Sequence, residues 1–301
     1  MVENNKLRVA IDLPNTRRFS TGFYSLDEIL GGGLVIGSIV EIFGEESDGK
    51  TTLGIQLLKQ AQENGFKLLY IDAEHSVTRE YLEQFLNLND LYFLKPASAE
   101  EAFDAVREFF EKYSDVKNMI FIDSVPALIP ERAVSDGSFK VAELALILSQ
   151  YLPIILRKYY NSIVVFTNQV RDIIDMRFGR GGETTTGGRA LRFYAGYRLK
   201  LDTIRLIFDS DKNQIGKVVK VEVIKNKFGK PFGSCFLDLY FGKGYSLNSD
   251  LLEFAINKKV IEVSGSWYKF EGQSVHGREE FLNRLNDKDF RDKLVDAISK
   301  I

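Results

Sequence analysis

The sequence predicts an α/β fold in which a mostly parallel sheet carries an antiparallel extension and a small α+β C-terminal domain. Between residues 36 and 190, short continuous apolar runs alternate with helical patterns, which is typical of parallel strands covered by helices on both faces. After residue 190, apolar and polar residues alternate, as in antiparallel strands. We therefore expect a short N-terminal segment (1–35), a core (36–245) and a small C-terminal domain (246–301).

The individual elements of the core follow from these patterns in chain order. Apolar runs predict strands at 38–43, 66–72, 119–123 and 162–167. Helical periodicity predicts helices at 50–64, 99–113 and 141–160. Alternating residues predict antiparallel strands at 193–208, 217–224 and 234–241. From about residue 246 the pattern is that of a helix, a hairpin and a helix, with a tight turn at 264–266.

Composition excludes several classes of protein. The chain has 301 residues, a net charge of −2, one cysteine and two histidines. An internal disulfide needs two cysteines, and a structural zinc site needs more ligands than these residues offer. The sequence contains no apolar run long enough to cross a membrane, and its N-terminus lacks the apolar core of a signal peptide. We expect a cytoplasmic protein with no membrane partner.

The strongest motif lies between the first predicted strand and the first predicted helix. It fits the pattern G-x-x-x-x-G-K-[ST] of phosphate-binding loops, with the residues Gly44, Glu45, Glu46, Ser47, Asp48, Gly49, Lys50 and Thr51. Loop amides and the positive end of the helix attract phosphate oxygens, Lys50 adds a charge, and the Thr51 hydroxyl suits Mg²⁺. Thr52 follows at the same site. A plain strand-to-helix turn is the alternative.

Polar side chains at the ends of other predicted strands complete this site. Asp123 ends the apolar run 119–123 and is expected to hold the water shell of Mg²⁺. Glu74, just past the strand 66–72, is the candidate for orienting the attacking water, with a solvated loop carboxylate as the alternative. Gln169 follows the strand 162–167 and is placed to sense a γ-phosphate, although amides at strand ends also cap loops.

The segment 171–200 is basic although the whole chain is acidic. It holds seven Lys or Arg residues and three Asp or Glu residues, a net charge of +4, together with many glycines and hydroxyls. Such a loop can follow a phosphate backbone, and an aromatic ring in it can insert between bases. An ordinary mobile basic loop is the alternative. The candidate DNA-binding residues are Arg171, Phe178, Arg180, Thr184, Thr185, Thr186, Gly187, Gly188 and Arg189.

These motifs together resemble the bacterial RecA recombinase family. The resemblance covers about residues 20–285 and includes the segments 70–75, 122–125, 168–171, 183–188, 190–191 and 225–227. It implies an ATPase core of RecA type that uses ATP and Mg²⁺ and forms a helical filament on single-stranded DNA, with duplex DNA as a later partner. Members act in strand exchange during recombination and repair.

The resemblance also implies roles for particular residues. Glu74 would activate water, and Gln169 would link the γ-phosphate to the DNA loop. Lys225 and Lys227 would reach the ATP of the neighbouring subunit, and Tyr81 would lie near the adenine. An accessory relative that binds nucleotide and DNA without strand exchange, and a ring-forming P-loop motor, are the alternative functions.

Several positions depart from the family pattern. Glu45 and Asp48 stand where Pro and Ser are usual, and added carboxylates are expected to repel a triphosphate unless they point outward. Thr78 replaces an adenine-contacting Asp. Members of the family have a second DNA site, which captures the incoming duplex. At its positions we expect basic residues, but the chain has Asp202, Thr203 and Glu222, and only Lys220 is retained. The segment before residue 20 is shorter than in the family, and so is the first DNA loop, between Pro130 and Val141. We also expect the acidic C-terminal tail of the family to be absent.

Overall fold

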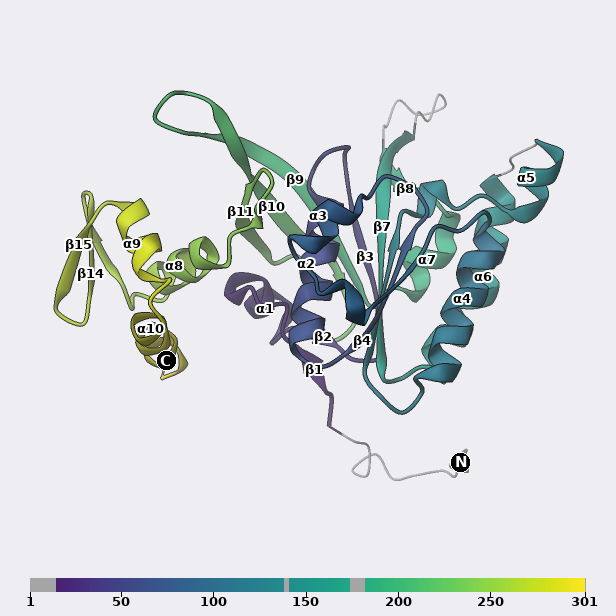
Figure 1. The fold of residues 1–301 in the computed structure, drawn as a ribbon, viewed down its shortest axis with the longest axis horizontal. Helices are drawn as coiled ribbons and strands as arrows, with labels where there is room; N and C mark the ends of the chain where they lie inside the picture. The colour runs from purple at the N-terminus through teal and green to yellow at the C-terminus, as the bar shows by residue number, and fades with distance from the viewer. Residues whose placement is uncertain (1–14, 138–140, 174–181, 301) are drawn as a thin grey trace.

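The computed structural model describes residues 15–137, 141–173 and 182–300. It confirms the predicted α/β class, since a large mixed sheet carries helices on both faces and a small antiparallel sheet lies in the C-terminal part (Figure 1). In spatial order the strands of the large sheet are β12 (Gly244–Tyr245), β11 (Ser234–Tyr240), β10 (Gln214–Asn226), β9 (Tyr197–Phe208), β3 (Ile39–Gly44), β7 (Ser162–Ile173), β6 (Asn118–Asp123), β4 (Lys67–Asp72) and β5 (Leu91–Leu94).

The direction of the strands divides this sheet into two parts. From β9 to β5 every neighbouring pair is parallel, whereas β10, β11 and β12 continue the sheet in antiparallel pairs. Parallel strands end at one common edge, so the carboxyl ends of β3, β4, β6 and β7 lie side by side. This is the edge at which the sequence places its polar residues.

Helices cover the two faces of the sheet. On one face, α1 (Tyr24–Leu30) and α2 (Lys50–Glu63) pack their apolar residues against β3, β6 and β10. On the other face lie α4 (Ala99–Lys112), α6 (Val141–Lys158) and α7 (Gly188–Tyr194). Both faces of the parallel part are therefore buried, which explains the continuous apolar runs of its strands.

Shorter elements connect this framework. The pair β1 (Arg18–Phe19) and β2 (Leu34–Val35) flanks α1 and buries its apolar residues in the same cluster as α2. The helices α3 (Arg79–Glu83) and α5 (Glu131–Asp136) follow β4 and β6. The strand β8 (Gly182–Thr185) pairs antiparallel with the end of β7, so the basic segment begins as a hairpin.

The C-terminal part has its own apolar cluster. Its elements are α8 (Leu247–Asn257), β13 (Glu262–Ser264), β14 (Trp267–Phe270), β15 (Gln273–His276), α9 (Arg278–Arg284) and α10 (Lys288–Ser299). The predicted turn at 264–266 is present between β13 and β14. The Asp250 carboxylate of α8 accepts hydrogen bonds from the amides of Tyr24 and Ser25 and thereby joins this part to α1. The domain limits at 36 and 246 stay predictions.

Three of the predicted strands are wrong at their ends. The strand expected at 217–224 is longer in both directions, since β10 spans Gln214–Asn226. The strand expected from residue 193 begins at Tyr197, because 193–194 complete α7. Leu191 is buried in the cluster of α6, and the spacing of Ala190, Leu191 and Tyr194 against that cluster is helical. The strand expected at 162–167 continues to Ile173, where its pairing with β8 extends it beyond the apolar run. The edge strand β5 was not predicted.

Candidate functional site

The phosphate-binding loop joins the end of β3 to the start of α2, as predicted. Two of its glycines are required by their surroundings. A Cβ on Gly44 would lie 2.4 Å from the carbonyl oxygen of Leu201, and Gly49 has a φ of 88°, in the left-handed region, directly before the helix. The first amides of α2 therefore point into the loop, with the positive end of the helix behind them.

Lys50 folds back over this loop. Its Nζ donates to the main-chain carbonyls of Gly44 at 3.2 Å and Glu45 at 2.5 Å. Burial lowers the pKa of Lys50, and the negative charges of Asp48 and Asp123 oppose that shift. These contacts hold Lys50 Nζ at the mouth of the loop, where a phosphate oxygen would bind.

Asp123 lies at the end of β6 and is surrounded by hydroxyl groups. Thr51 Oγ1 donates to its Oδ2 at 2.7 Å, Tyr70 donates to the same oxygen at 3.3 Å, and Thr167 donates to its Oδ1. Burial raises the pKa of Asp123, and the hydroxyl donors oppose this shift. Thr51 and Asp123 together offer hard oxygen ligands beside the phosphate loop, which fits Mg²⁺ shared with phosphates and water.

Glu74 lies on the same edge, just after β4. Its Oε1 accepts a hydrogen bond from Ser124 Oγ, and its amide donates to the carbonyl of Asp123 at 3.2 Å. Ser124 therefore fixes the carboxylate next to the metal-side aspartate. The structure brings together the predicted residues Lys50, Thr51, Asp123 and Glu74. Their roles in hydrolysis remain predictions.

Tyr81 and Thr52 also lie close together. The Tyr81 hydroxyl is 3.0 Å from Thr52 Oγ1, so α3 is tied to the first turn of α2. Thr78, which replaces an expected aspartate, caps α3 by accepting a hydrogen bond from the Tyr81 amide at 3.3 Å. The tyrosine ring packs against Phe85. A base-binding role for Tyr81 remains a prediction.

The carboxylates of the loop take different directions. Glu45 and Glu46 are exposed, whereas Asp48 is buried. Asp48 Oδ2 accepts from the Glu45 amide at 2.9 Å, and Oδ1 accepts from the amide and hydroxyl of Thr203 on β9. The exposure of Glu45 is therefore in line with the expectation that an added carboxylate points outward, whereas Asp48 does not point outward and instead bonds to the loop and to β9.

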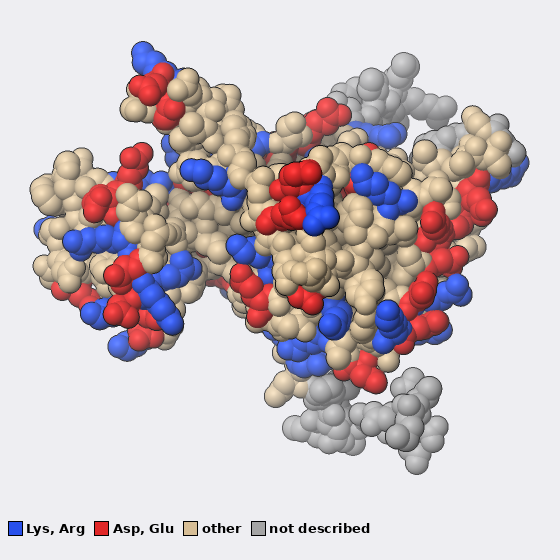
Figure 2. Space-filling view, viewed as in Figure 1, with Lys and Arg blue, Asp and Glu red and all other residues tan. Residues whose placement is uncertain are grey.

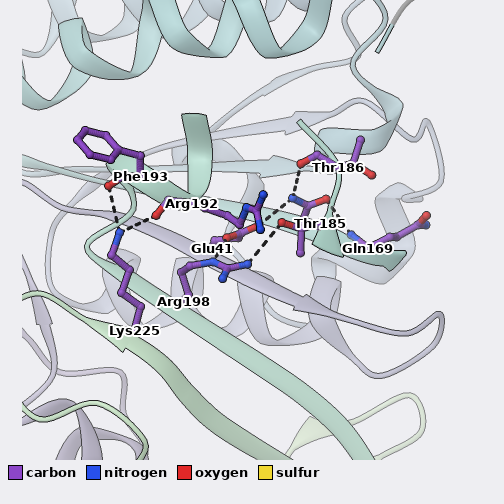
Figure 3. Close-up of polar contacts among 9 residues, drawn as sticks. Glu41, Gln169, Thr185, Thr186, Arg192, Phe193, Arg198 and Lys225 are labelled. Atoms are coloured by element: carbon purple, nitrogen blue, oxygen red, sulfur yellow. Dashed lines mark hydrogen bonds and ion pairs between the residues drawn. The ribbon is translucent and has the colours of Figure 1, made fainter. Parts of the chain in front are cut away.

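Gln169 lies beside the phosphate loop because β7 pairs with β3. Its Cα is opposite that of Gly44. The preceding Asn168 donates from Nδ2 to Glu41 Oε1 at 2.8 Å and to the carbonyl of Thr186 at 2.9 Å. Arg198 forms an ion pair with Glu41 at 2.5 Å and donates to Thr185 Oγ1 at 3.4 Å (Figure 3). A buried polar network therefore joins β3 to the end of the basic segment.

The predicted DNA-binding residues fall into three groups. Arg171 and Arg189 are exposed, and Arg171 is paired with Thr184 across the β7–β8 hairpin. Phe178 and Arg180 lie outside the described residues. In contrast, Thr185, Thr186 and Gly187 are buried, and Gly187 precedes α7 with Gly188 as its first residue.

The expectation that the whole stretch 184–188 is a loop is therefore wrong, because Gly182–Thr185 form β8 and α7 begins at Gly188. The carbonyl of Thr186 accepts a hydrogen bond from Asn168, whereas the buried Thr186 Oγ1 has no hydrogen-bond partner among the described residues. DNA contact by Thr185, Thr186 and Gly187 remains a prediction, and it requires these residues to become exposed.

Lys225 and Lys227 lie near the end of β10 and hold the end of α7. Lys225 Nζ donates to the carbonyls of Arg192 and Phe193 at 2.6 and 3.0 Å (Figure 3). Lys227 Nζ donates to the carbonyl of Phe193 at 2.8 Å. Burial, followed by the charge of Lys227, lowers the pKa of Lys225 to about 8. Two cations at the negative end of a helix are electrostatically favourable. Contact with a neighbour's nucleotide remains a prediction.

The hydroxyls around the metal-side carboxylate were not predicted. Tyr70, Ser124 and Thr167 stand at or beside strand ends, and each bonds to Asp123 or Glu74. The available signal was their position, since hydroxyl residues at the ends of buried parallel strands face the ligand edge of the sheet.

Comparison with known proteins identifies the family of this chain. The RecA N-terminal domain family matches residues 8–246. The chain belongs to the RecA family. It is 38% identical over 273 residues to Protein RecA of Delftia acidovorans, covering 87% of this chain and 73% of that protein. It is 37% identical over 289 residues to Protein RecA of Rickettsia bellii (94% and 82%), and 36% identical over 292 residues to that of Pseudomonas fluorescens (92% and 82%).

Family membership assigns the chain to DNA recombination and repair, with ATP and DNA as its ligands. Figure 2 shows acidic and basic side chains interspersed over the visible face, as expected for a net charge of −2. DNA contact must therefore come from local features, such as the basic segment of this RecA-family chain. Among the described residues, none of the helices combines the length and apolar character needed to span a membrane.

Proposed function

We propose that this protein is a DNA-stimulated ATPase that polymerises on single-stranded DNA and exchanges homologous strands. The observation that carries the proposal is the contact of Thr51 with Asp123 at 2.7 Å beside Lys50 and Glu74, on the sheet edge from which the basic segment departs. A nucleotide site and a DNA segment joined by one strand are the parts that such an enzyme needs.

In the proposed hydrolysis, the loop amides and Lys50 bind the β- and γ-phosphates. Thr51 and the water shell on Asp123 would hold Mg²⁺, which would supply positive charge to the phosphates. Glu74, oriented by Ser124, positions the water that attacks the γ-phosphorus. The bond between the β–γ bridging oxygen and the γ-phosphorus breaks, ADP leaves with that oxygen, and the proton of the water passes to Glu74 and then to solvent.

The strand β7 provides the path from nucleotide to DNA. Gln169 lies beside Gly44 of the phosphate loop, and Arg171 follows two residues later on the same strand. We expect a γ-phosphate to fix Gln169 and thereby the β7–β8 hairpin, which places Arg171 on the DNA backbone. The affinity for single-stranded DNA then rises with ATP and falls after hydrolysis.

A filament completes the proposed site. Lys225 and Lys227 would leave the end of α7 and reach the phosphates of the neighbouring subunit, as cations that stabilise transition-state charge. A ring-forming motor and an accessory protein without strand exchange are not favoured by the family match.

The first experiment is ATP turnover with and without single-stranded DNA, for the wild type and for Lys50→Ala and Arg171→Ala. We expect strong stimulation by DNA, loss of turnover with Lys50→Ala, and loss of the DNA response alone with Arg171→Ala. Since Arg171 contacts phosphate in this scheme, Arg171→Ala also lowers the salt dependence of DNA affinity by about one unit of slope. Turnover that ignores DNA in the wild type would contradict the proposal.

A further inference from the structure

The buried carboxylate of Asp48 connects the phosphate loop to the antiparallel part of the sheet. Its exposed fraction is 5%, and it bonds on both sides. Oδ2 accepts from the amide of Glu45 at 2.9 Å, within the loop. Oδ1 accepts from Thr203 on β9, at 3.2 Å from the amide and 2.6 Å from the hydroxyl. The side chain therefore spans from the loop to the strand behind it.

A lysine on the neighbouring strand holds the next part of the loop. Lys217 of β10 is 6% exposed, and its Nζ donates to the carbonyl of Ser47. Ser47 has a φ of 61°, which non-glycine residues adopt rarely, and the hydrogen bond from Lys217 is made to this unusual part of the loop. We call Asp48, Thr203 and Lys217 the P-loop clasp.

We propose that the P-loop clasp positions the loop amides for phosphate binding and that Thr203 is therefore a residue that sets nucleotide affinity. The inference rests on the proposed binding of ATP at this loop. A carboxylate in the middle of a phosphate loop would repel a triphosphate if it could turn toward it. The Thr203 hydroxyl and amide supply donors that keep it turned away, while Lys217 adds a positive charge on the same side.

Asp48 and Thr203 both depart from the family pattern, and the hydrogen bonds between them explain both departures. Asp48 replaces the usual serine, and Thr203 stands where we expected a basic DNA-binding residue. Lys220, on the same strand as Lys217, instead pairs with Glu222 at 2.7 Å. On this argument, Thr203 serves the nucleotide site.

The mechanism predicts a particular kinetic signature. The clasp acts on the shape of the loop before and during the reaction. Its loss therefore weakens the binding of ATP and the binding of the transition state to the same extent. The KM for ATP then rises while kcat at saturation stays the same. A hydrogen bond to a charged group is strong enough for an effect of about 10-fold or more.

The test is Thr203→Val, Thr203→Ser and the wild type, compared by direct titration with a fluorescent ATP analogue and by steady-state turnover. Valine has nearly the shape of threonine but lacks the hydroxyl, whereas serine keeps the hydroxyl. We expect about a 10-fold weaker affinity for Thr203→Val, near wild-type affinity for Thr203→Ser, and equal kcat values. Lys217→Met should also weaken binding, and Lys212→Met, which removes an exposed cation in the turn between β9 and β10, is the matched control that should not.

The outcomes separate this inference from the proposed function. If the wild type fails to bind ATP, the proposed function fails. If the wild type binds ATP and Thr203→Val binds it equally well, the clasp has no positioning role. Equal losses in Thr203→Val and Thr203→Ser, accompanied by a lower Tm in both, would mean that residue 203 supports only the fold and would overturn the inference. If Lys217→Met weakens ATP binding no more than Lys212→Met does, Lys217 is not part of the clasp.

Discussion

Asp123 illustrates how single residues prepare the site. Its carboxylate is buried at the end of β6, where ionisation is costly, and the hydroxyls of Thr51, Tyr70 and Thr167 all donate to it. These donors compensate the buried charge and aim one oxygen at the threonine of the phosphate loop. These contacts support the proposal that Asp123 holds the water shell of Mg²⁺.

We predict that Asp123→Asn raises the Mg²⁺ concentration needed for half-maximal ATP turnover by about 10–100-fold, the usual cost of removing an outer-shell carboxylate. Asparagine replaces one carboxylate oxygen, an acceptor, by an NH₂ group, a donor, which then faces the neighbouring hydroxyl donors. A Mg²⁺ titration of turnover measures the effect. Tyr70→Phe, which removes a donor at 3.3 Å and leaves the carboxylate, is the control and should shift the titration far less. An unchanged titration for Asp123→Asn would exclude a metal role.

At the scale of elements, the closest contact between α2 and the sheet depends on a glycine. Gly54 is buried in the middle of the helix, and a Cβ at this position would lie 2.2 Å from the ring of Phe121 on β6. The helix that carries Lys50 and Thr51 can therefore approach β6, which carries Asp123, only because this side chain is absent. The spacing of the site follows from that approach.

We predict that Gly54→Ala destabilises the protein by about 1–3 kcal/mol, although alanine favours helices, because the ring must move. Urea unfolding measures the loss. Phe121→Leu should reduce the cost of Gly54→Ala, and Glu63→Ala on the exposed side of the same helix should change stability by less than about 0.5 kcal/mol. An alanine that is neutral at residue 54 would contradict the close packing.

The joint between α1 and α8 depends on Asp250. Its carboxylate is buried and accepts from the Tyr24 amide at 2.5 Å and from Ser25. Burial raises the pKa of Asp250 to about 6. The folded protein therefore holds a proton on this group that the unfolded chain releases at lower pH. Its favourable contribution is complete below about pH 4 and is lost as the pH rises through about 6.

We predict that the free energy of unfolding of the wild type, relative to Asp250→Asn, falls by on the order of 3 kcal/mol between pH 4 and pH 7. Asparagine does not titrate, so the difference between the two proteins isolates this group. Urea unfolding at several pH values measures it. A difference that is constant with pH would show that Asp250 titrates normally.

At the scale of the whole molecule, the proposed ATP site draws on two subunits. Lys50 and Glu74 lie at one edge of the parallel sheet. Lys225 and Lys227 lie near the end of β10, which is beyond β9 in the strand order, and they bond the end of α7. An arrangement of subunits in a filament would allow these lysines to reach a neighbouring site.

We predict that two inactive variants restore turnover when mixed. Lys50→Ala removes the phosphate-loop lysine, and the double variant Lys225→Ala with Lys227→Ala removes the cations offered to the neighbour. In a mixed filament, some sites combine an intact loop with intact lysines, so ATP turnover on single-stranded DNA should exceed the sum of the separate variants. Each variant assayed alone, at the total protein concentration of the mixture, is the control. No recovery, with filaments visible by electron microscopy, would place all these residues in one subunit's site.

Much of this organisation could be predicted from the sequence. Continuous apolar runs and a glycine-rich loop between strand and helix are local signals, so they placed β3, α2, β4 and β6 within one or two residues. The start of β9 could not be predicted in this way, because residues 193–194 are apolar and aromatic and suit a strand as well as a helix. Packing of Leu191 against α6 decides between them.

The sequence by itself determined the α/β class, the phosphate loop and the resemblance to the family, because these depend on periodicity and on residues adjacent in the chain. Only the tertiary structure decided which charges compensate one another. Asp48 meets Thr203 across 155 residues, and Glu41 meets Arg198 across 157. It also decided that Thr185 and Thr186 are buried. Charge compensation and burial depend on contacts between distant segments, and those contacts exist only once the sheet has assembled.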